Sequence, residues 1–223
     1  MEQVKAGKAT DLTPIITNAD FSNNGTGWTQ SSKFTNANGY VAEYWNTNFD
    51  FYQTISSLPK GEYELGVQSF FRMSDINTAL AAHNAGTEQL NAILYANDNE
   101  KPVMSLYDDT ITLYEQSPYS YPDNVTAANT AFNTYGLYTN TLSFKLDKET
   151  DLKIGIRKTE WNNADWCCFD NFTLRFLGSP SSVVSVQNGY NEDGKWYNLQ
   201  GLEVGRSHAK RGIYLHNGQK VVR

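Results

Sequence analysis

One carboxylate stands out because it lies inside a strongly apolar stretch. Residues 166–178 alternate aromatic and aliphatic side chains as a buried strand does, and this run contains Asp170. An ionised carboxylate in such surroundings needs a cation or several hydrogen-bond donors. Since side chains alternate between the faces of a strand, the residues predicted to share its face are Trp166, Cys168, Phe172, Leu174 and Phe176. The sequence therefore predicts a structural site around Asp170.

Aromatic residues stand beside short polar side chains in segments that have the composition of loops. Trp45 precedes Asn-Thr-Asn, Trp161 precedes two asparagines, and Tyr107 precedes a long segment rich in tyrosine, serine and proline. Sugar rings present apolar C–H faces and hydroxyl edges, so their sites combine exposed aromatic rings with polar groups. The candidate ligand contacts are Trp45, Trp161, Asn162, Asn163, Asp165, Arg72 and Tyr107. The alternative is that each tryptophan packs as core or as a lid over one end of the domain.

Arg72 closes an apolar, strand-like run and precedes the Ala-rich residues 75–83. Its fixed fork of donors could hold a carboxylate, a sugar acid or the end of a helix. The alternative is an ion pair with an acidic residue of the Ala-rich segment.

Composition disfavours several other chemistries. The histidines are His83, His208 and His216, and the last two lie in the tail, so we expect neither a Ser-His-Asp triad nor a histidine metal centre within the main body. Residues 25–27 (Gly-Thr-Gly) lack the third glycine of a phosphate loop. A net charge of −6 makes nucleic acid an unexpected partner. Paired carboxylates could still serve a glycoside hydrolase, but an acidic surface always offers such pairs.

The two cysteines, Cys167 and Cys168, are adjacent in a predicted strand. They should point to opposite faces, so a disulfide between them would distort the backbone, and we expect two buried free thiols. No run of eighteen apolar residues occurs, and no transmembrane segment is expected. Residues 1–8 lack the apolar core of a signal peptide. Either the protein is cytoplasmic or its signal is not part of this sequence.

Short strands would position these residues. Strand patterns cover residues 40–45, 49–55, 62–71, 90–96, 103–107, 141–146, 152–157 and 166–177. Residues 75–83 and 127–135 predict two short helices between strands. About eight antiparallel strands predict an all-β sandwich or jelly roll, with Trp28 and Trp166 in its core.

Composition divides the chain into four parts. We expect a polar lead-in over residues 1–14, the sandwich over 15–178, a Ser-Pro-Ser-Ser linker over 179–182 and a small C-terminal β tail domain over 183–223. Within the tail, residues 195–205 predict one hairpin. Residues 212–223 predict another, since Asn217-Gly218 suits a type I′ turn.

Three groups of residues occur in a recognisable order. They are Asn18-Ala19-Asp20-Phe21 with Gly27-Trp28, then residues 51–63 with a Leu-Pro-Lys-Gly turn, then Phe169-Asp170-Asn171-Phe172. This order resembles the galactose-binding-like sandwich of many carbohydrate-binding modules, over nearly all of residues 15–178. Residues 69–72, 85–90, 94–97 and 165–166 resemble more narrowly a sandwich domain of large exported Bacteroidetes proteins. Residues 196–201 and 212–215 are similar to C-terminal tail and sorting domains of exported Bacteroidetes proteins.

The resemblance implies a galactose-binding-like jelly-roll sandwich with short helical insertions and a small C-terminal β-hairpin unit. It also implies a structural calcium, for which Asn18, Asp20 and Asp170 are the candidate ligands. Ser22 stands where the family has a glutamate, which lowers the charge offered to an ion that prefers six to eight oxygens. The alternative is that Asp170 accepts N–H bonds from the turn after the first strand, without a metal.

These observations together predict a non-catalytic carbohydrate-binding module whose partner is a glycan. It would belong to an exported protein, in the extracellular space, at the cell surface or in the periplasm, and other domains of a larger chain could accompany it. A structural or adhesion module that contacts protein is the alternative, and a glycoside-active enzyme is the third.

Overall fold

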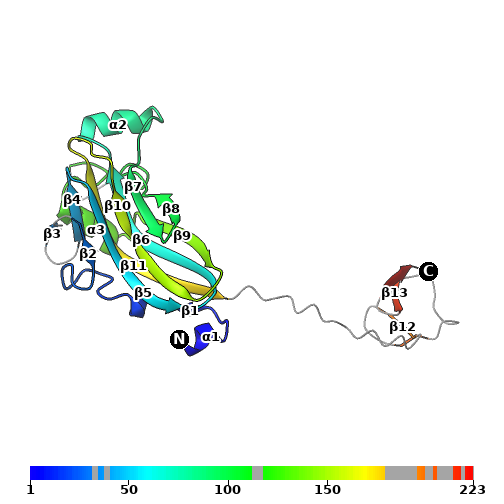
Figure 1. Cartoon of the computed structure of the whole chain (residues 1–223). Coiled ribbons are helices and arrows are strands. Elements are labelled where there is room, and N and C mark those ends of the chain that lie inside the picture. Colours follow the sequence, from blue (N-terminus) through cyan, green and yellow to red (C-terminus); the bar gives the residue numbers. More distant parts are fainter. Residues whose placement is uncertain are drawn as a thin grey trace. The chain divides into compact units, whose positions relative to one another are not determined.

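Alternating apolar and polar residues build two antiparallel sheets. The computed structural model describes residues 1–31, 35–37, 41–111, 118–178, 195–198, 203–204, 213–216 and 219–222. These belong to two units, Met1–Pro180 and Ser181–Arg223. The first unit is the all-β sandwich that the sequence predicts (Figure 1).

One sheet contains most of the residues of interest. Its strand order is β3-β4-β11-β6-β9, and β1 also pairs with β11. The strands are β1 (Thr10–Asp11), β3 (Thr35–Ala37), β4 (Val41–Trp45), β6 (Gly61–Arg72), β9 (Thr139–Leu146) and β11 (Trp166–Gly178). We call this sheet the first sheet.

The second sheet has the order β2-β5-β10-β7-β8. Its strands are β2 (Thr29–Gln30), β5 (Phe49–Leu58), β7 (Ala92–Ala96), β8 (Asn99–Pro102) and β10 (Thr150–Lys158). Apolar side chains from both sheets pack together between them, including Phe51, Leu65, Ile154 and Phe169. Trp28 is buried in this core and stacks on Phe51 with ring centroids 4.9 Å apart, as the sequence predicts.

A second apolar cluster covers the other face of the first sheet. It joins Phe70 and Trp166 of the sheet to Phe132 of helix α3 (Val125–Asn133) and to Tyr138. Both faces of β6 and β11 are therefore buried near their Arg72 and Trp166 ends. Cys167 lies in the inner core and Cys168 in the outer cluster, and both are free thiols, as predicted.

The face that Asp170 occupies differs from the prediction. The ladder between β11 and β6 shifts register between Asp170 and Thr173, and Asn171 has φ 53°. This bulge inserts a residue and reverses the alternation. Trp166, Cys168 and Asp170 therefore share the outer face, whereas Phe172, Leu174 and Phe176 point into the inner core with Phe169. The prediction of one common face for all of them was wrong.

Both predicted helices are present. Helix α2 (Ile76–Asn84) follows β6, and α3 precedes β9. In Figure 1, α2 lies at one end of the sandwich and α1 (Glu2–Lys5) lies at the opposite end. Residues 103–107 do not form the predicted strand; Ser105 makes a single bridge to Phe71.

The first fourteen residues belong to the sandwich unit instead of preceding it. Strand β1 pairs with β11, the 3-10 helix η1 covers Thr13–Ile15, and Val4 and Leu12 are buried in the inner core. A polar composition did not indicate these two anchoring side chains.

The second unit contains a small antiparallel sheet of β12 (Trp196–Tyr197), β13 (Ile213–His216) and β14 (Gln219–Val222). The β13–β14 pairing confirms the second predicted hairpin, whose Asn217-Gly218 turn lies outside the described residues. Tyr197 also bridges Glu203, within the first predicted hairpin. Among the described residues, no helix has the length and apolar character needed to span a membrane.

Candidate functional site

Three strands bring two tryptophans and an arginine into one row at the α2 end of the first sheet. Trp45 of β4 lies opposite Trp166 of β11, which in turn lies opposite Arg72 of β6. Residues opposite each other in antiparallel strands point to the same face. The guanidinium carbon of Arg72 lies 5.1 Å from the ring centroid of Trp45 and 5.3 Å from that of Trp166. The two rings thus provide cation–π contacts to one cation.

Arg72 is 3 % exposed, and its two hydrogen bonds go to uncharged backbone carbonyl groups, while the charge of Asp75 acts on it without forming an ion pair. Its Nε donates to the Ser74 carbonyl oxygen at 2.7 Å, and its Nη2 donates to the Ala164 carbonyl oxygen at 3.4 Å. The ion pairs of the described residues do not include Arg72, so the alternative of an ion pair with the Ala-rich segment is not observed there. Burial lowers the pKa of this guanidinium, yet arginine stays protonated in proteins.

Arg72 is the one buried residue among the described residues that line a surface depression of about 430 Å³. Two of the lining residues are exposed aromatic rings, Trp45 at 50 % and Tyr119 at 41 %. The other lining residues are Asp75, Ile76, Asn77 and Asp123. The depression thus combines aromatic rings, one cation, two carboxylates and an amide.

The start of helix α2 forms one wall of this depression. Asp75 is the N-cap, and its Oδ1 accepts hydrogen bonds from the backbone N–H groups of Asn77 and Thr78, each at 3.1 Å. The hydrogen bonds from Thr78 are the main cause of the lowered pKa of Asp75. The carboxylate is therefore ionised and fixed by the helix end.

A stack of tyrosines supports Tyr119. Its ring is parallel to that of Tyr121 at a centroid distance of 5.0 Å, and Tyr121 meets the edge of Tyr107 at 5.0 Å. Tyr107 is 7 % exposed and its hydroxyl donates to the Ile76 carbonyl oxygen at 2.9 Å. Tyr107 is therefore a buried support of the depression, and we leave it out of the ligand contacts.

Trp161, at 57 % exposure, lies next to the depression on the loop before β11. Its Nε1 donates to the Asn46 carbonyl oxygen at 3.3 Å, and Asn46 directly follows Trp45. The Asn46 Oδ1 accepts from the Ala164 N–H at 3.1 Å, which joins the two loops a second time. Ser74 Oγ donates to the Asn163 carbonyl oxygen at 3.2 Å. Both tryptophans are thus exposed at one end of the sandwich, although Trp161 does not line the depression itself.

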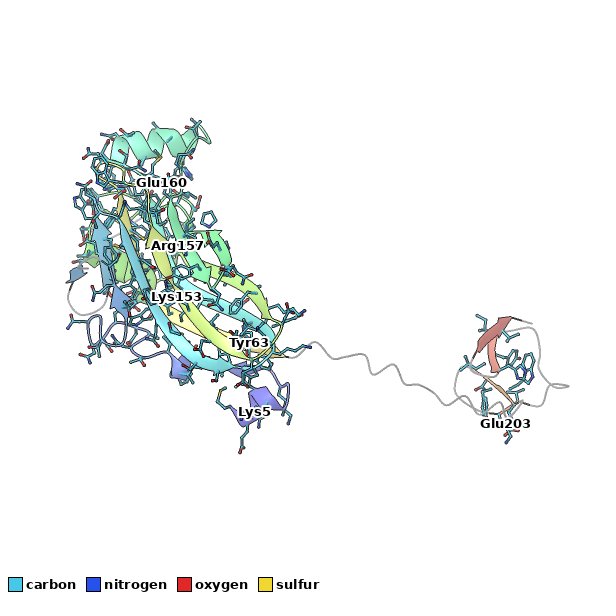
Figure 2. The ribbon with its side chains drawn as sticks, in the orientation of Figure 1. Lys5, Tyr63, Lys153, Arg157, Glu160 and Glu203 are labelled. Carbon is cyan, nitrogen blue, oxygen red and sulfur yellow. The ribbon has the colours of Figure 1, made fainter. Side chains whose placement is uncertain are left out.

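Asp165 has a structural role at this end. Its Oδ2 accepts from Lys158 Nζ in a fully buried ion pair, and from the backbone N–H of Asn162 at 3.1 Å. The side chain of Asp165 is buried, so it cannot reach a ligand in this conformation. It instead fixes the loop that presents Trp161 and Asn162. In Figure 2, Glu160 of this loop lies near α2, whereas Tyr63 lies toward the α1 end.

Asp170 lies on the same outer face, in a separate polar cluster. Its Oδ1 accepts from the Asn171 N–H at 2.8 Å, and its Oδ2 accepts from Asn133 Nδ2 of α3 at 3.0 Å. Burial raises the pKa of the Asp170 carboxyl to about 7, and the negative charge of Asp20 acts in the same direction. The residues that line the adjoining cavity of about 320 Å³ are Asp20, Ser22, Asn129, Asn133, Asp170 and Asn171.

The donor set of this cavity fits calcium incompletely. Asp20 and Asp170 are its two carboxylates, and both oxygens of Asp170 already accept N–H bonds. Asn18 uses its side chain within its own loop, since Nδ2 donates to the Asn24 carbonyl oxygen and Oδ1 accepts from the Asn23 N–H. No cluster of three or more His, Cys, Asp or Glu occurs in the part of the chain that the structure describes. Calcium remains a prediction from the resemblance.

The sequence did not indicate four residues of the depression, Asp75, Ile76, Asn77 and Asp123. One signal was available, because an aspartate before an Ala-rich run is typical of an N-cap and places the start of a helix directly after Arg72. Asp123 gave no comparable signal, since nothing in the sequence around it shows that it lies beside the start of α2 in the fold.

Comparisons with known proteins add a structural likeness. No protein-family model matches the sequence, and no curated protein matches it. Among solved structures, TmCBM61 in complex with β-1,4-galactotriose is similar, with a TM-score of 0.39 and 16 % sequence identity. The match covers 72 % of this chain and 96 % of that chain. A likeness at this level does not bear on what the chain binds.

Proposed function

We propose that the sandwich unit is a non-catalytic glycan-binding module whose site is the depression around Trp45 and Arg72. The observation that carries the proposal is the gathering of exposed aromatic rings and fixed polar groups at one end of the sandwich. Trp45 and Tyr119 line the depression beside Arg72, Asp75 and Asn77, and Trp161 lies next to it.

Each part of this site suits one part of a sugar. An exposed tryptophan or tyrosine ring can stack on the apolar C–H face of a pyranose. Carboxylate, amide and guanidinium groups can bind the hydroxyl edge. The rings are held in place by the tyrosine stack and by the Asn46 contacts, so little side-chain entropy is lost when a ligand binds.

Glycan arrays followed by calorimetry test the proposal. The full chain is screened against plant, host and microbial glycans, and we expect binding that Trp45→Ala abolishes or weakens strongly. Tyr135→Ala is the matched control, because Tyr135 is also an exposed aromatic residue but follows α3 and does not line the depression. Absence of binding across diverse glycans would reject the proposal and favour a structural or adhesion module.

We further propose that the protein acts outside the cytoplasm and that residues 181–223 serve export. The support is the similarity of the tail to sorting domains. Removing residues 181–223 should impair export in the native host, while the melting temperature of the sandwich unit stays unchanged. Normal export of the shortened chain would contradict this role.

A further inference from the structure

Arg72 is a buried cation that forms no ion pair within the described residues, although the charge of Asp75 acts on it from a longer distance. It is 3 % exposed, and the ion pairs of that part of the chain leave it out. A charge removed from water is stable only when it is paired or fully hydrogen-bonded. Because a guanidinium does not lose its proton in proteins, Arg72 cannot become neutral.

The protein satisfies this cation only in part. Arginine has five N–H donors. Two hydrogen bonds, to the carbonyl oxygens of Ser74 and Ala164, use two of these donors. The rings of Trp45 and Trp166 contact the guanidinium plane but accept no further strong hydrogen bond. Since Arg72 also lines the depression, donors that the described residues leave unused are within reach of a ligand.

We propose that the depression binds an acidic sugar, a uronic or sialic acid, whose carboxylate pairs with Arg72. This inference rests on the glycan-binding function proposed above and narrows the ligand class. A carboxylate matches the planar fork of a guanidinium and can accept two hydrogen bonds from it. The pyranose ring of the same sugar then lies against Trp45 or Tyr119, the two exposed rings of the depression.

Asp75, whose charge acts on Arg72 without an ion pair, and Asp123 do not cancel this preference. Asp75 is exposed, and its Oδ1 is engaged by the N–H groups at the start of α2; the Asp123 Oδ1 accepts from Asn124 Nδ2 at 2.7 Å. Charges near water are screened, whereas the buried charge of Arg72 acts through a lower effective dielectric. The two aspartates are instead acceptors for the hydroxyl groups that a sugar acid carries on its other carbons.

Matched pairs of sugars test the inference on the wild-type chain. Calorimetry compares methyl galacturonoside with methyl galactoside, and methyl glucuronoside with methyl glucoside; sialic acid is a further probe. We expect the acid of a matched pair to bind at least about tenfold more tightly than its neutral partner, since hydrogen bonds between two charged groups are stronger than those to a neutral hydroxyl group. We also expect the preference to fall as salt rises.

The outcomes separate the two proposals. If neutral sugars bind as tightly as the acids or more tightly, the acidic ligand class is wrong and the glycan-binding function stands. If neither class binds, both fail.

Arg72→Met and Arg72→Lys locate the preference. Arg72→Met should bring the affinity for the acid down to that for its neutral partner, whatever it does to neutral binding. Arg72→Lys should retain part of the acid's advantage, because lysine keeps the charge but not the fork. Lys153→Met is the matched control, since Lys153 is a cation that contacts aromatic rings on the second sheet. An acid preference that survives Arg72→Met would overturn the inference. Circular dichroism checks that each variant folds. If a variant does not fold, the comparison of acidic with neutral sugars on the wild-type chain still tests the inference.

Discussion

Two buried charged side chains lie on the outer face of the same sheet, and the protein accommodates them in opposite ways. Asp170 of β11 is a carboxyl without a cationic partner, and Arg72 of β6 is a cation without a carboxylate partner among the described residues. Asp170 follows Trp166 along β11, and Trp166 lies opposite Arg72 on β6. The two charged residues are therefore close together on the sheet.

The polar groups around Asp170 hydrogen-bond to one another, although they also line the cavity described above. Asn133 and Asn171 both donate to the carboxyl, and Asn171 Nδ2 donates on to Gln68 Oε1 at 2.6 Å. Gln68 in turn donates to the Phe132 carbonyl oxygen of α3 at 2.8 Å. Since burial raises the pKa of Asp170 to about 7, this group can also become neutral by binding a proton. The cluster therefore attaches α3 to the sheet without needing a ligand.

Arg72 cannot become neutral in a similar way, because a guanidinium stays protonated in proteins. It lies between two rings, donates to two carbonyl oxygens, and lines a depression that has exposed aromatic walls. A buried carboxyl group that takes up a proton needs no partner to become neutral, whereas the guanidinium of Arg72 keeps its charge. We therefore assign ligand binding to the Arg72 end and attachment of α3 to the Asp170 end.

The largest effect should come from breaking a buried charge that is paired. Lys158→Met leaves Asp165 buried without its cation, and Asp165 Oδ1 already has no hydrogen-bond partner. Loss of one member of a buried pair costs about 3–5 kcal/mol. Arg72→Met should cost less, about 1–3 kcal/mol, because it leaves two carbonyl groups without donors and no orphaned carboxylate. Urea unfolding measures both; equal costs would indicate that Arg72 has an anionic partner within the protein.

The next effect is the dependence of the free energy of unfolding on pH through Asp170. The folded pKa of Asp170, about 7, is above its unfolded value of 3.8. The unfolded chain therefore releases its proton first as pH rises from 4 to 7, so stability present below pH 4 is lost over that interval. A folded pKa that is one pH unit above the unfolded pKa corresponds to about 1.4 kcal/mol, so the free energy of unfolding should fall by a few kcal/mol.

Asp170→Asn is the matched test, because it has the same shape and does not titrate. The free energy of unfolding of this variant should lack the decrease attributable to Asp170 between pH 4 and 7. The same slope in wild type and variant would show that Asp170 is already ionised in the folded protein.

A smaller effect concerns the aromatic rings of the Arg72 end. Trp45→Ala should weaken glycan binding at least about tenfold, or about 1.4 kcal/mol, because a stacked ring is lost. Trp161→Ala should weaken it less, since Trp161 lies beside the depression without lining it. The reverse order, measured by calorimetry with the tightest glycan from the arrays, would place the site on the loop before β11.

The smallest effect should be that of a chelator. With two carboxylates whose oxygens already accept hydrogen bonds, the cavity beside Asp170 should bind calcium weakly. A site with a Kd above the calcium concentration changes the melting temperature by only about 1 °C for a domain of this size. A rise of several degrees with millimolar calcium, lost in Asp170→Asn, would establish the structural calcium that the resemblance implies.

The sequence indicated the long strands because their alternation is local. The patterns over residues 62–71 and 166–177 correspond to β6 and β11. The reversal at Asn171 was not indicated, since its left-handed backbone follows from pairing with β6 and contact with α3 as much as from its own tolerance of positive φ.

The site was indicated by residue type but not by arrangement. Trp45, Trp161 and Arg72 could be named because aromatic and guanidinium groups beside short polar residues are typical of sugar sites, while packing as a lid or an ion pair stayed open as the alternative. Their common location depends on pairing between β4, β11 and β6, which connects residues about 100 positions apart. Tyr107 and Asp165 have the same composition around them, but the fold buries both.

Nuclear magnetic resonance during a titration with methyl galacturonoside shows directly whether the ligand binds at the Arg72 end or at the Asp170 end. We expect the Nε–H signal of Arg72 and the indole signals of Trp45 and Trp166 to shift with ligand, while the side-chain amide signals of Asn133 and Asn171 stay in place. If the amide signals around Asp170 shift and the Arg72 signal does not, the ligand binds in the cavity beside Asp170, and the assignment of binding to the Arg72 end is wrong.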